Sequence, residues 1–185
     1  MENVVQEIIL VSVVLVLGLV IIGFTVSYLY PQIVLSSEEQ TANNIASQTT
    51  LSVGPVLSGS SSTGSLVMEV YDPGVSGNVS VLAFVEPQSF ETSVGLVTPP
   101  TSPNFKVYLP NGKPAYSFTS GNIYDLNGRL LVRSEHVYTV PFNQPFTISV
   151  NNFNSNDIVI IWVMYGQGEL FRIGFTFTGV PSSGG

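Results

Sequence analysis

Hydrophobic and polar positions divide the chain into one long apolar segment near its start and an alternating pattern over most of the rest. Residues 8–26 (IILVSVVLVLGLVIIGFTV) are almost entirely apolar, and Glu7 is the only charged residue between positions 4 and 30. A bilayer core about 30 Å thick requires about 20 apolar residues of helix, at about 1.5 Å per residue. The pattern therefore predicts an apolar helix over residues 4–35 that is long enough to span a membrane once.

Polar residues with a weak apolar stripe at helical spacing follow this segment and extend the predicted helix to residues 1–53. Pro31 lacks a backbone donor and clashes with the preceding turn, so a kink is expected near it. A helix of this length measures about 75 Å, so its polar second half must lie outside any membrane. Gly54-Pro55 is expected to end the helix, and residues 54–64 form a linker.

Residues 65–180 change to a two-residue alternation interrupted by turn sequences, which predicts short β-strands. Hairpins are expected around Pro110–Pro114 and around Asn127-Gly128, the second with a type I′ turn. The strongest pair of strands covers residues 158–165 and 171–177. Its first strand is apolar on both faces, so we expect a central strand that is covered on both sides.

Several short strands between turns predict an all-β immunoglobulin-like sandwich as the head domain, with a closed barrel as the alternative. The expected fold class is α+β, a long N-terminal hydrophobic helix followed by this head, with residues 181–185 as a tail.

Composition argues against nucleic-acid binding and favours an extracellular setting. The 185 residues include five basic and twelve acidic side chains, for a net charge of −7, so no basic patch is available for nucleic acid. The chain has no cysteine, which excludes disulfides and thiolate chemistry. Only 9% of the residues are charged, which predicts a weak dependence of stability on pH and suits an extracellular setting.

Candidate catalytic, metal-binding and cofactor-binding residues are not found in the sequence, which predicts that the protein is not an enzyme. His136 is the single histidine, too few for a zinc or copper site without cysteine. Asp125-x-Asn127-Gly128 resembles the start of a calcium loop but lacks the downstream glutamate, so a hairpin turn is favoured. Asn78-Val79-Ser80 is the one glycosylation sequon and makes Asn78 a candidate for modification after export.

The residues before the apolar run bear on how the chain matures. A membrane anchor usually carries Lys or Arg on its cytoplasmic flank, whereas this chain has Glu2 and Glu7 there. We therefore expect that a leader bearing the basic residues is removed, which leaves a new N-terminus directly before the apolar run. If Met1 is instead the initiator, no leader existed.

An apolar run from Val4 to Ile22 close to the start, a helix that continues to about Leu51, and a Ser/Thr-rich β head without cysteine together resemble type IV pilins. The resemblance is closer to archaeal pilins and archaellins. It implies a leader peptidase, transient membrane insertion and an assembly platform, followed by a helical homopolymer at the cell surface. In such filaments the helices bundle as the core and the heads lie outside, for adhesion or motility.

The resemblance also implies roles for particular residues. Pro31 would kink the helix. Bacterial members carry a glutamate at the fifth mature position, where this chain has Val5, so Glu2 or Glu7 would pair with a neighbour's amino terminus only in a different register. The residues expected to pack in the filament core are Val4, Ile8, Val11, Leu15, Gly18, Leu19, Ile22 and Val26.

Two other interpretations stay open. The first is a single-pass membrane protein whose extracellular β-domain acts as a binding module. The second is a filament joined by strand donation between heads, which requires an extended N-terminus and is disfavoured by the apolar run.

Overall fold

The computed structural model describes residues 1–59 and 61–181, and the chain divides into two compact units, Met1–Glu38 and Glu39–Gly185. The first unit contains α1 (Glu2–Phe24), a π-helical turn η1 (Thr25–Leu29) and the first turns of α2 (Tyr30–Gln48). The second contains the last turns of α2 and a head built of strands. The predicted α+β class with a β-sandwich-like head is confirmed. The boundary between the units lies inside the helix, whereas we expected it at residue 53.

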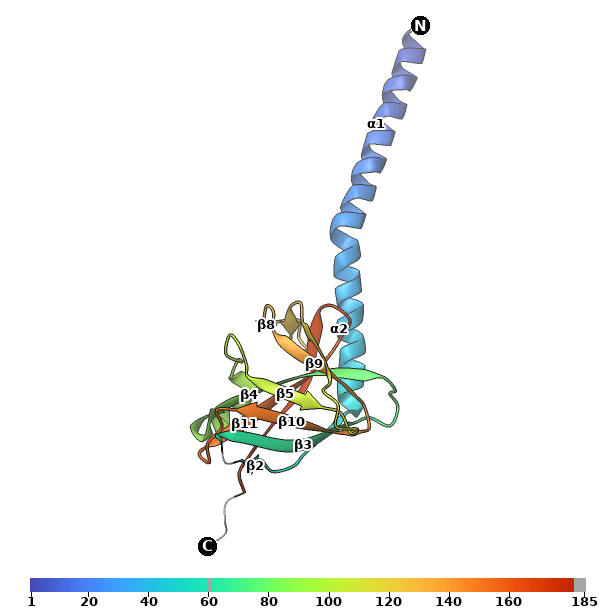
Figure 1. The fold of residues 1–185 in the computed structure, drawn as a ribbon. Coiled ribbons are helices and arrows are strands. Elements are labelled where there is room, and N and C mark those ends of the chain that lie inside the picture. The colour runs from blue at the N-terminus through green and yellow to red at the C-terminus, as the bar shows by residue number, and fades with distance from the viewer. Residues whose placement is uncertain (60, 182–185) are drawn as a thin grey trace. The chain divides into compact units, whose positions relative to one another are not determined.

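The irregularity expected near Pro31 is a widened turn directly before it. The N–H of Tyr30 donates to the carbonyl of Thr25, five residues earlier, as in a π-helix. Proline has no N–H, so the carbonyl of Ser27 has no donor four residues further along, and a wider turn relieves the clash with the proline ring. The helix continues through this point without a break (Figure 1).

The predicted end of the helix at residue 53 is wrong, because α2 ends at Gln48 and Thr50–Val53 form the strand β1. The sequence Thr-Leu-Ser-Val has β-branched residues at both ends, and β1 pairs antiparallel with β3 (Thr63–Tyr71). The expected linker also contains a short strand, β2 (Leu57–Ser58), paired with β3. Ser60 of that linker and residues 182–185 of the expected tail lie outside the described residues.

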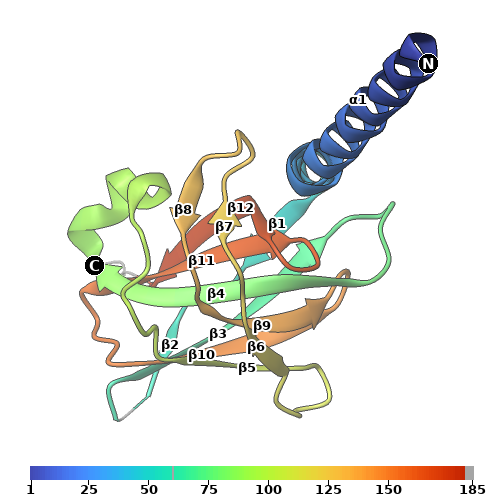
Figure 2. The same cartoon turned by 90° about the horizontal axis from the view of Figure 1, so that it is seen from above.

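Two sheets form the head (Figure 2). One has the strand order β1-β3-β10-β5, with β2 also pairing with β3, and the other has the order β6-β9-β4-β11-β12-β7-β8. The described pairs are antiparallel except β12 with β7, which is parallel. The strands not yet given bounds are β4 (Asn78–Pro87), β5 (Phe105–Tyr108), β6 (Tyr116–Thr119), β7 (Ile123–Tyr124), β8 (Leu130–Val132), β9 (His136–Pro141), β10 (Pro145–Asn151), β11 (Asp157–Tyr165) and β12 (Leu170–Gly179).

The core of the head lies between the facing sides of the two sheets. The register of β3 with β10 places Leu66 opposite Ile148, and both are buried. From the other sheet, the Tyr138 hydroxyl donates to the carbonyl of Phe105, and the two rings lie edge to face with centroids 5.0 Å apart. Packing of two apolar sheet faces at this interface stabilises the head.

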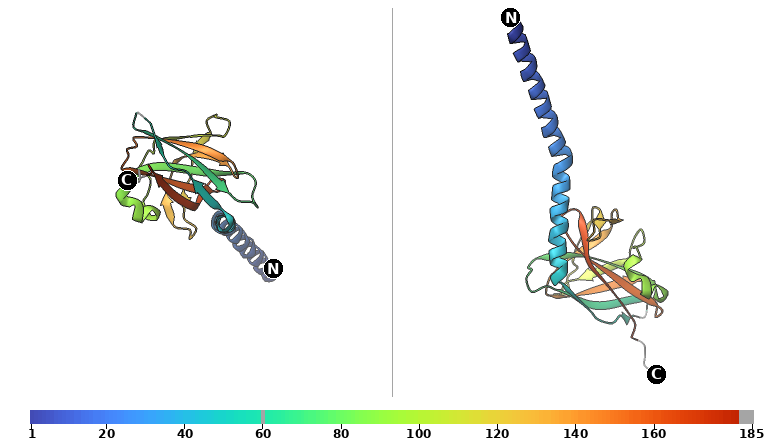
Figure 3. Two further views of the ribbon diagram at one scale, coloured as in Figure 1. Left: turned by 90° about the horizontal axis from the view of Figure 1, so that it is seen from below. Right: turned by 180° about the vertical axis from the view of Figure 1, so that it is seen from behind.

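The expected central strand is confirmed. β11 lies between β4 and β12, and every residue from Ile158 to Met164 is buried. On the side away from the sandwich core, Trp162 is covered by the guanidinium of Arg172, 4.7 Å from its ring centroid. A 3₁₀ segment, η2 (Gln88–Leu96), contacts β4, β11 and β12 and completes the cover (Figure 3).

The hairpin predicted around Pro110–Pro114 forms only at its base. The N–H of Leu109 donates to the carbonyl of Lys113, and Tyr108 forms an antiparallel bridge with Pro114. Beyond this bridge, β5 pairs with β10, and β6 pairs with β9 in the other sheet. Local turn chemistry brings the ends together, whereas the two strands find their ladders in different layers.

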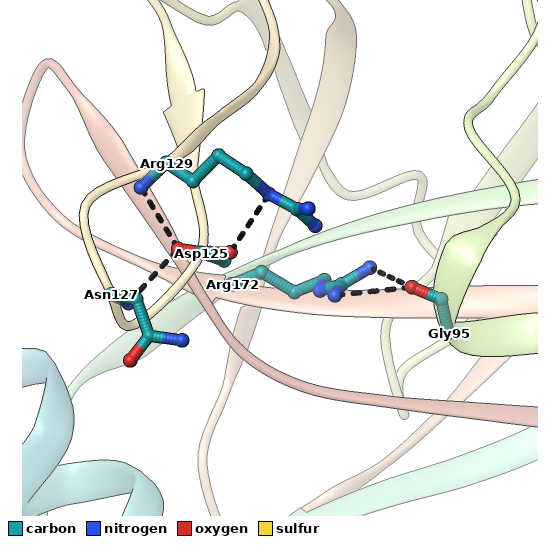
Figure 4. Close-up of polar contacts among 5 residues, drawn as sticks. All are labelled: Gly95, Asp125, Asn127, Arg129 and Arg172. Atoms are coloured by element: carbon teal, nitrogen blue, oxygen red, sulfur yellow. Dashed lines mark hydrogen bonds and ion pairs between the residues drawn. The ribbon is translucent and has the colours of Figure 1, made fainter.

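The hairpin predicted around Asn127-Gly128 is confirmed as a pair of strands, β7 with β8, but its turn is not type I′. Only Gly128 has a positive φ, of +76°. One carboxylate oxygen of Asp125 accepts from the N–H groups of Asn127 and Arg129, which favours a turn over Asp125–Gly128 followed by a left-handed glycine (Figure 4).

Candidate functional site: the apolar surface of the N-terminal helix

Large apolar side chains cover the first helical segment on all sides and none of them is buried within the chain. No residue of α1 or η1 is buried. By length and composition this is a helix able to cross a membrane. The exposed large apolar side chains between positions 4 and 34 are Val4, Val5, Ile8, Ile9, Leu10, Val11, Val13, Val14, Leu15, Val16, Leu17, Leu19, Val20, Ile21, Ile22, Phe24, Val26, Tyr28, Leu29, Tyr30, Ile33 and Val34.

The residues expected to pack in a filament core share one stripe of this helix, because at about 100° per residue they fall within about a third of its circumference. Their large side chains, from Val4 to Val26, are between 56% and 70% exposed. Apart from the neighbouring helix backbone, no atom of the described residues lies within 4 Å of the point where a Cβ on Gly18 would stand, so the stripe has an open notch at this position.

The other sides of the helix are just as apolar, which the list of predicted packing residues missed. Leu10, Leu17 and Ile21 point away from the stripe and are 56–67% exposed. The uninterrupted apolar run itself indicated them, because an amphipathic surface helix would carry polar residues on one of its faces. A helix with this surface fits an environment that surrounds it, either lipid or other helices.

Exposure of this surface to water is costly. At about 1.5–3 kcal/mol for each large apolar side chain, covering the segment is worth tens of kcal/mol, more than the 5–15 kcal/mol that stabilises a typical domain. The Ser12 and Thr25 hydroxyls donate to carbonyls four residues earlier, 2.8 Å away in each case, so these polar groups are satisfied within the helix. The segment therefore needs no water for its own hydrogen bonds.

Glu2 and Glu7 lie near the start of the helix, about 140° apart around its axis. Both are exposed, and neither takes part in an ion pair among the described residues. Glu2 lies in the first turn, where a negative charge is favourable. The intermolecular pairing expected for them stays a prediction.

The head brings few ionisable groups together. Within the described residues, no group of three or more His, Cys, Asp or Glu side chains is placed to hold a metal ion. His136 is exposed and its ring contacts Tyr138 edge to face. Asn78, the candidate for glycosylation, is exposed at the start of β4.

Burial shifts the pKa of four head groups. It raises the pKa of Glu86 and of Glu135, the second against an opposing backbone hydrogen bond at His136. It raises the pKa of Tyr138, with a further contribution from Tyr108. Burial against Trp162 lowers the pKa of Arg172, while Asp125 acts in the opposite direction. In Figure 4 the Arg172 guanidinium points to the carbonyl of Gly95, 3.4 Å away. These contacts close the outer face of β11.

Comparison with family models, with curated proteins and with solved structures found no match to this chain.

Proposed function

We propose that this chain is the structural subunit of an extracellular type IV pilus-like filament, in which the N-terminal helices bundle as the core and the β heads form the outer surface for adhesion or motility. The observation that carries the proposal is the apolar surface of α1 and η1, in which none of the described residues is buried.

The contrast between the two units supports this proposal. The head buries its own apolar residues between and behind its sheets, with Trp162, Ile160 and Ile161 fully inaccessible. None of the first 38 residues is buried, although Leu35 and Glu38 are half-buried. Many copies of one helix can cover one another on all sides, and helices leave no backbone group unsatisfied when they exchange lipid for one another.

A single-pass membrane anchor for an extracellular binding module is the second candidate. It is favoured by the aromatic residues at the end of the apolar run, where Phe24 and Tyr28 stack with ring centroids 5.3 Å apart and Tyr30 is exposed. Tyrosines at this position are typical of a membrane interface. A subunit that waits in the membrane before assembly would use the same residues, so this observation fits both candidates.

Shearing intact cells separates the two. Filaments break off and sediment from the medium without detergent, whereas an anchored monomer stays with the membranes until detergent extracts it. We expect the chain in the sheared fraction, as thin filaments by negative-stain microscopy, with N-terminal sequencing that starts shortly before Val4. A chain found solely as detergent-soluble monomers would refute the filament.

A further inference from the structure

Three neighbouring strands at one edge of the head share a row of side chains on the outer face of the sheet. Tyr116 of the edge strand β6 lies opposite Thr139 of β9, and Thr139 lies opposite Ser80 of β4. Residues opposite each other in antiparallel strands point to the same face, and so do residues two apart in one strand. Asn78, two residues before Ser80, therefore projects from the same face as Tyr116.

Tyr116 presents an aromatic ring to solvent at this edge. Its side chain is 72% exposed, and its ring is stacked on that of Phe118 at 6.2 Å between centroids and 20° between planes. The ring thus lies beside Phe118 and remains largely exposed. An exposed aromatic platform held in one orientation is a surface on which an apolar face of a ligand can stack.

Two hollows border Asn78. One, of about 390 Å³, is lined by Asn78 and Tyr116 together with the polar side chains of Asn111, Thr139 and Gln144. The other, of about 360 Å³, is lined by Asn78 and Phe118 among others. Both volumes lie in the range of sites that hold small ligands. The aromatic pair and the sequon asparagine are thus parts of one continuous surface.

The side chain of Asn78 is free to react. It is exposed, and its amide makes no hydrogen bond to any of the residues that the structure describes. The preceding residue, Gly77, has φ of +121° and open space around it. Asn78-Val79-Ser80 is the one Asn-x-Ser/Thr triplet in the sequence.

We infer that Asn78 carries an N-linked oligosaccharide and that its sugars lie across the hollow and pack on Tyr116. The inference rests on the export that the proposed function requires. The side-chain nitrogen of Asn78 forms a bond to the anomeric carbon of a lipid-phosphate-linked oligosaccharide donor, under a membrane oligosaccharyltransferase. The carbon–oxygen bond to the lipid phosphate breaks, the phosphate leaves with the electron pair, and the amide loses one proton.

A saccharide matches this surface in chemistry and reach. A pyranose ring has one face of C–H groups, which suits the exposed ring of Tyr116, and hydroxyls at its rim, which suit the amides of Asn111 and Gln144. Two strand spacings and one step of two residues separate Asn78 from Tyr116, a distance of about 12 Å that a short oligosaccharide spans.

Glycopeptide mass spectrometry of the full-length chain, from both the sheared and the membrane fractions, tests the modification. We expect a glycan on the peptide that contains Asn78, loss of that mass in Asn78→Gln, and its retention in the matched variant Ser80→Thr, which keeps the sequon. An unmodified Asn78 in exported chains would overturn the inference, even when filaments form. A glycan on chains that remain membrane monomers would support it while refuting the filament.

A double-mutant cycle tests the packing. Asn78→Gln should lower the melting temperature by about 2–4 °C, the effect of one aromatic contact in a chain of this size. The same change should have no further effect in Tyr116→Ala but its full effect in Tyr116→Phe, which keeps the ring. Additive effects in the Ala background would overturn the packing.

Discussion

Leu15 offers the sharpest test of the helical core, because its side chain lies in the middle of the apolar segment and is 62% exposed in the single chain. Leu15→Glu removes burial worth about 2 kcal/mol on assembly. It also places a carboxylate among apolar helices. The free-energy cost of burying this carboxylate cannot exceed the cost of protonating it, which is about 4 kcal/mol at pH 7 for a glutamate of ordinary pKa. The total of about 6 kcal/mol predicts a concentration for assembly about 10⁴-fold higher.

The same arithmetic predicts recovery in acid. At pH 5 neutralisation costs about 1 kcal/mol, so the defect should shrink to about 10²-fold. The assay is the amount of chain that sediments after shearing, measured from pH 5 to pH 7 beside the amount in the membrane fraction. Membrane levels should change little, because the remaining apolar residues still support insertion.

Two matched variants serve as controls. Leu15→Met keeps the volume and polarity and should assemble normally. Gln40→Glu adds the same charge at an exposed position of the polar half and should also assemble. Filaments from Leu15→Glu at the normal yield at pH 7 would refute a core built from this segment.

Three further predictions concern the helix turn and the head. Pro31→Ala supplies the missing N–H, so η1 should relax toward an α-helical turn and alter the helical parameters of the filament; unchanged parameters would mean that the proline is incidental. Asp72→Ala should lower the free energy of unfolding by about 2–4 kcal/mol in denaturant titrations, because Asp72 is inaccessible and accepts from the Thr49 hydroxyl and the N–H of Gly74; a loss below about 0.5 kcal/mol would contradict this. For pH, the raised pKa of Glu135 means that the folded state binds its proton more tightly than the unfolded one, so stability should rise as the pH falls toward 4.5. Glu135→Gln should flatten this part of the profile in thermal melts, and an unaltered slope would exclude Glu135 as its source.

Local sequence patterns predicted the structure correctly where a segment is so strongly apolar that distant contacts could not change its structure. The run from residue 8 to 26 has no polar face, so no packing within one domain could have hidden it, and it is exposed as expected. β11 and β12 also follow the prediction, because two strongly apolar strands joined by Gly166-Gln167-Gly168 have each other as nearest partners.

Predictions failed where distant segments competed for the same hydrogen bonds. Residues 50–53 directly follow the helix in the sequence. They nevertheless form hydrogen bonds with β3, whose paired residues lie 15 or more positions away. The turn at Pro110–Pro114 forms as its prolines and Asn111-Gly112 dictate, but β5 and β6 separate because β10 and β9 bind them in different sheets. Buried Asp72 likewise depends on residues far from it in the sequence. The Thr49 hydroxyl donates to its carboxylate, and the side-chain oxygen of Asn143 accepts from its backbone N–H.

The sequence alone determined that an apolar helix needs cover from outside the chain and that a sheet-rich head follows it, since both depend on composition and on local period. Tertiary structure alone decided where the helix gives way to the head, which strands share a sheet, and that Asn78 and Tyr116 face the same hollow. These depend on contacts between residues far apart in the chain, and the free energy of such contacts is absent from any short stretch of sequence.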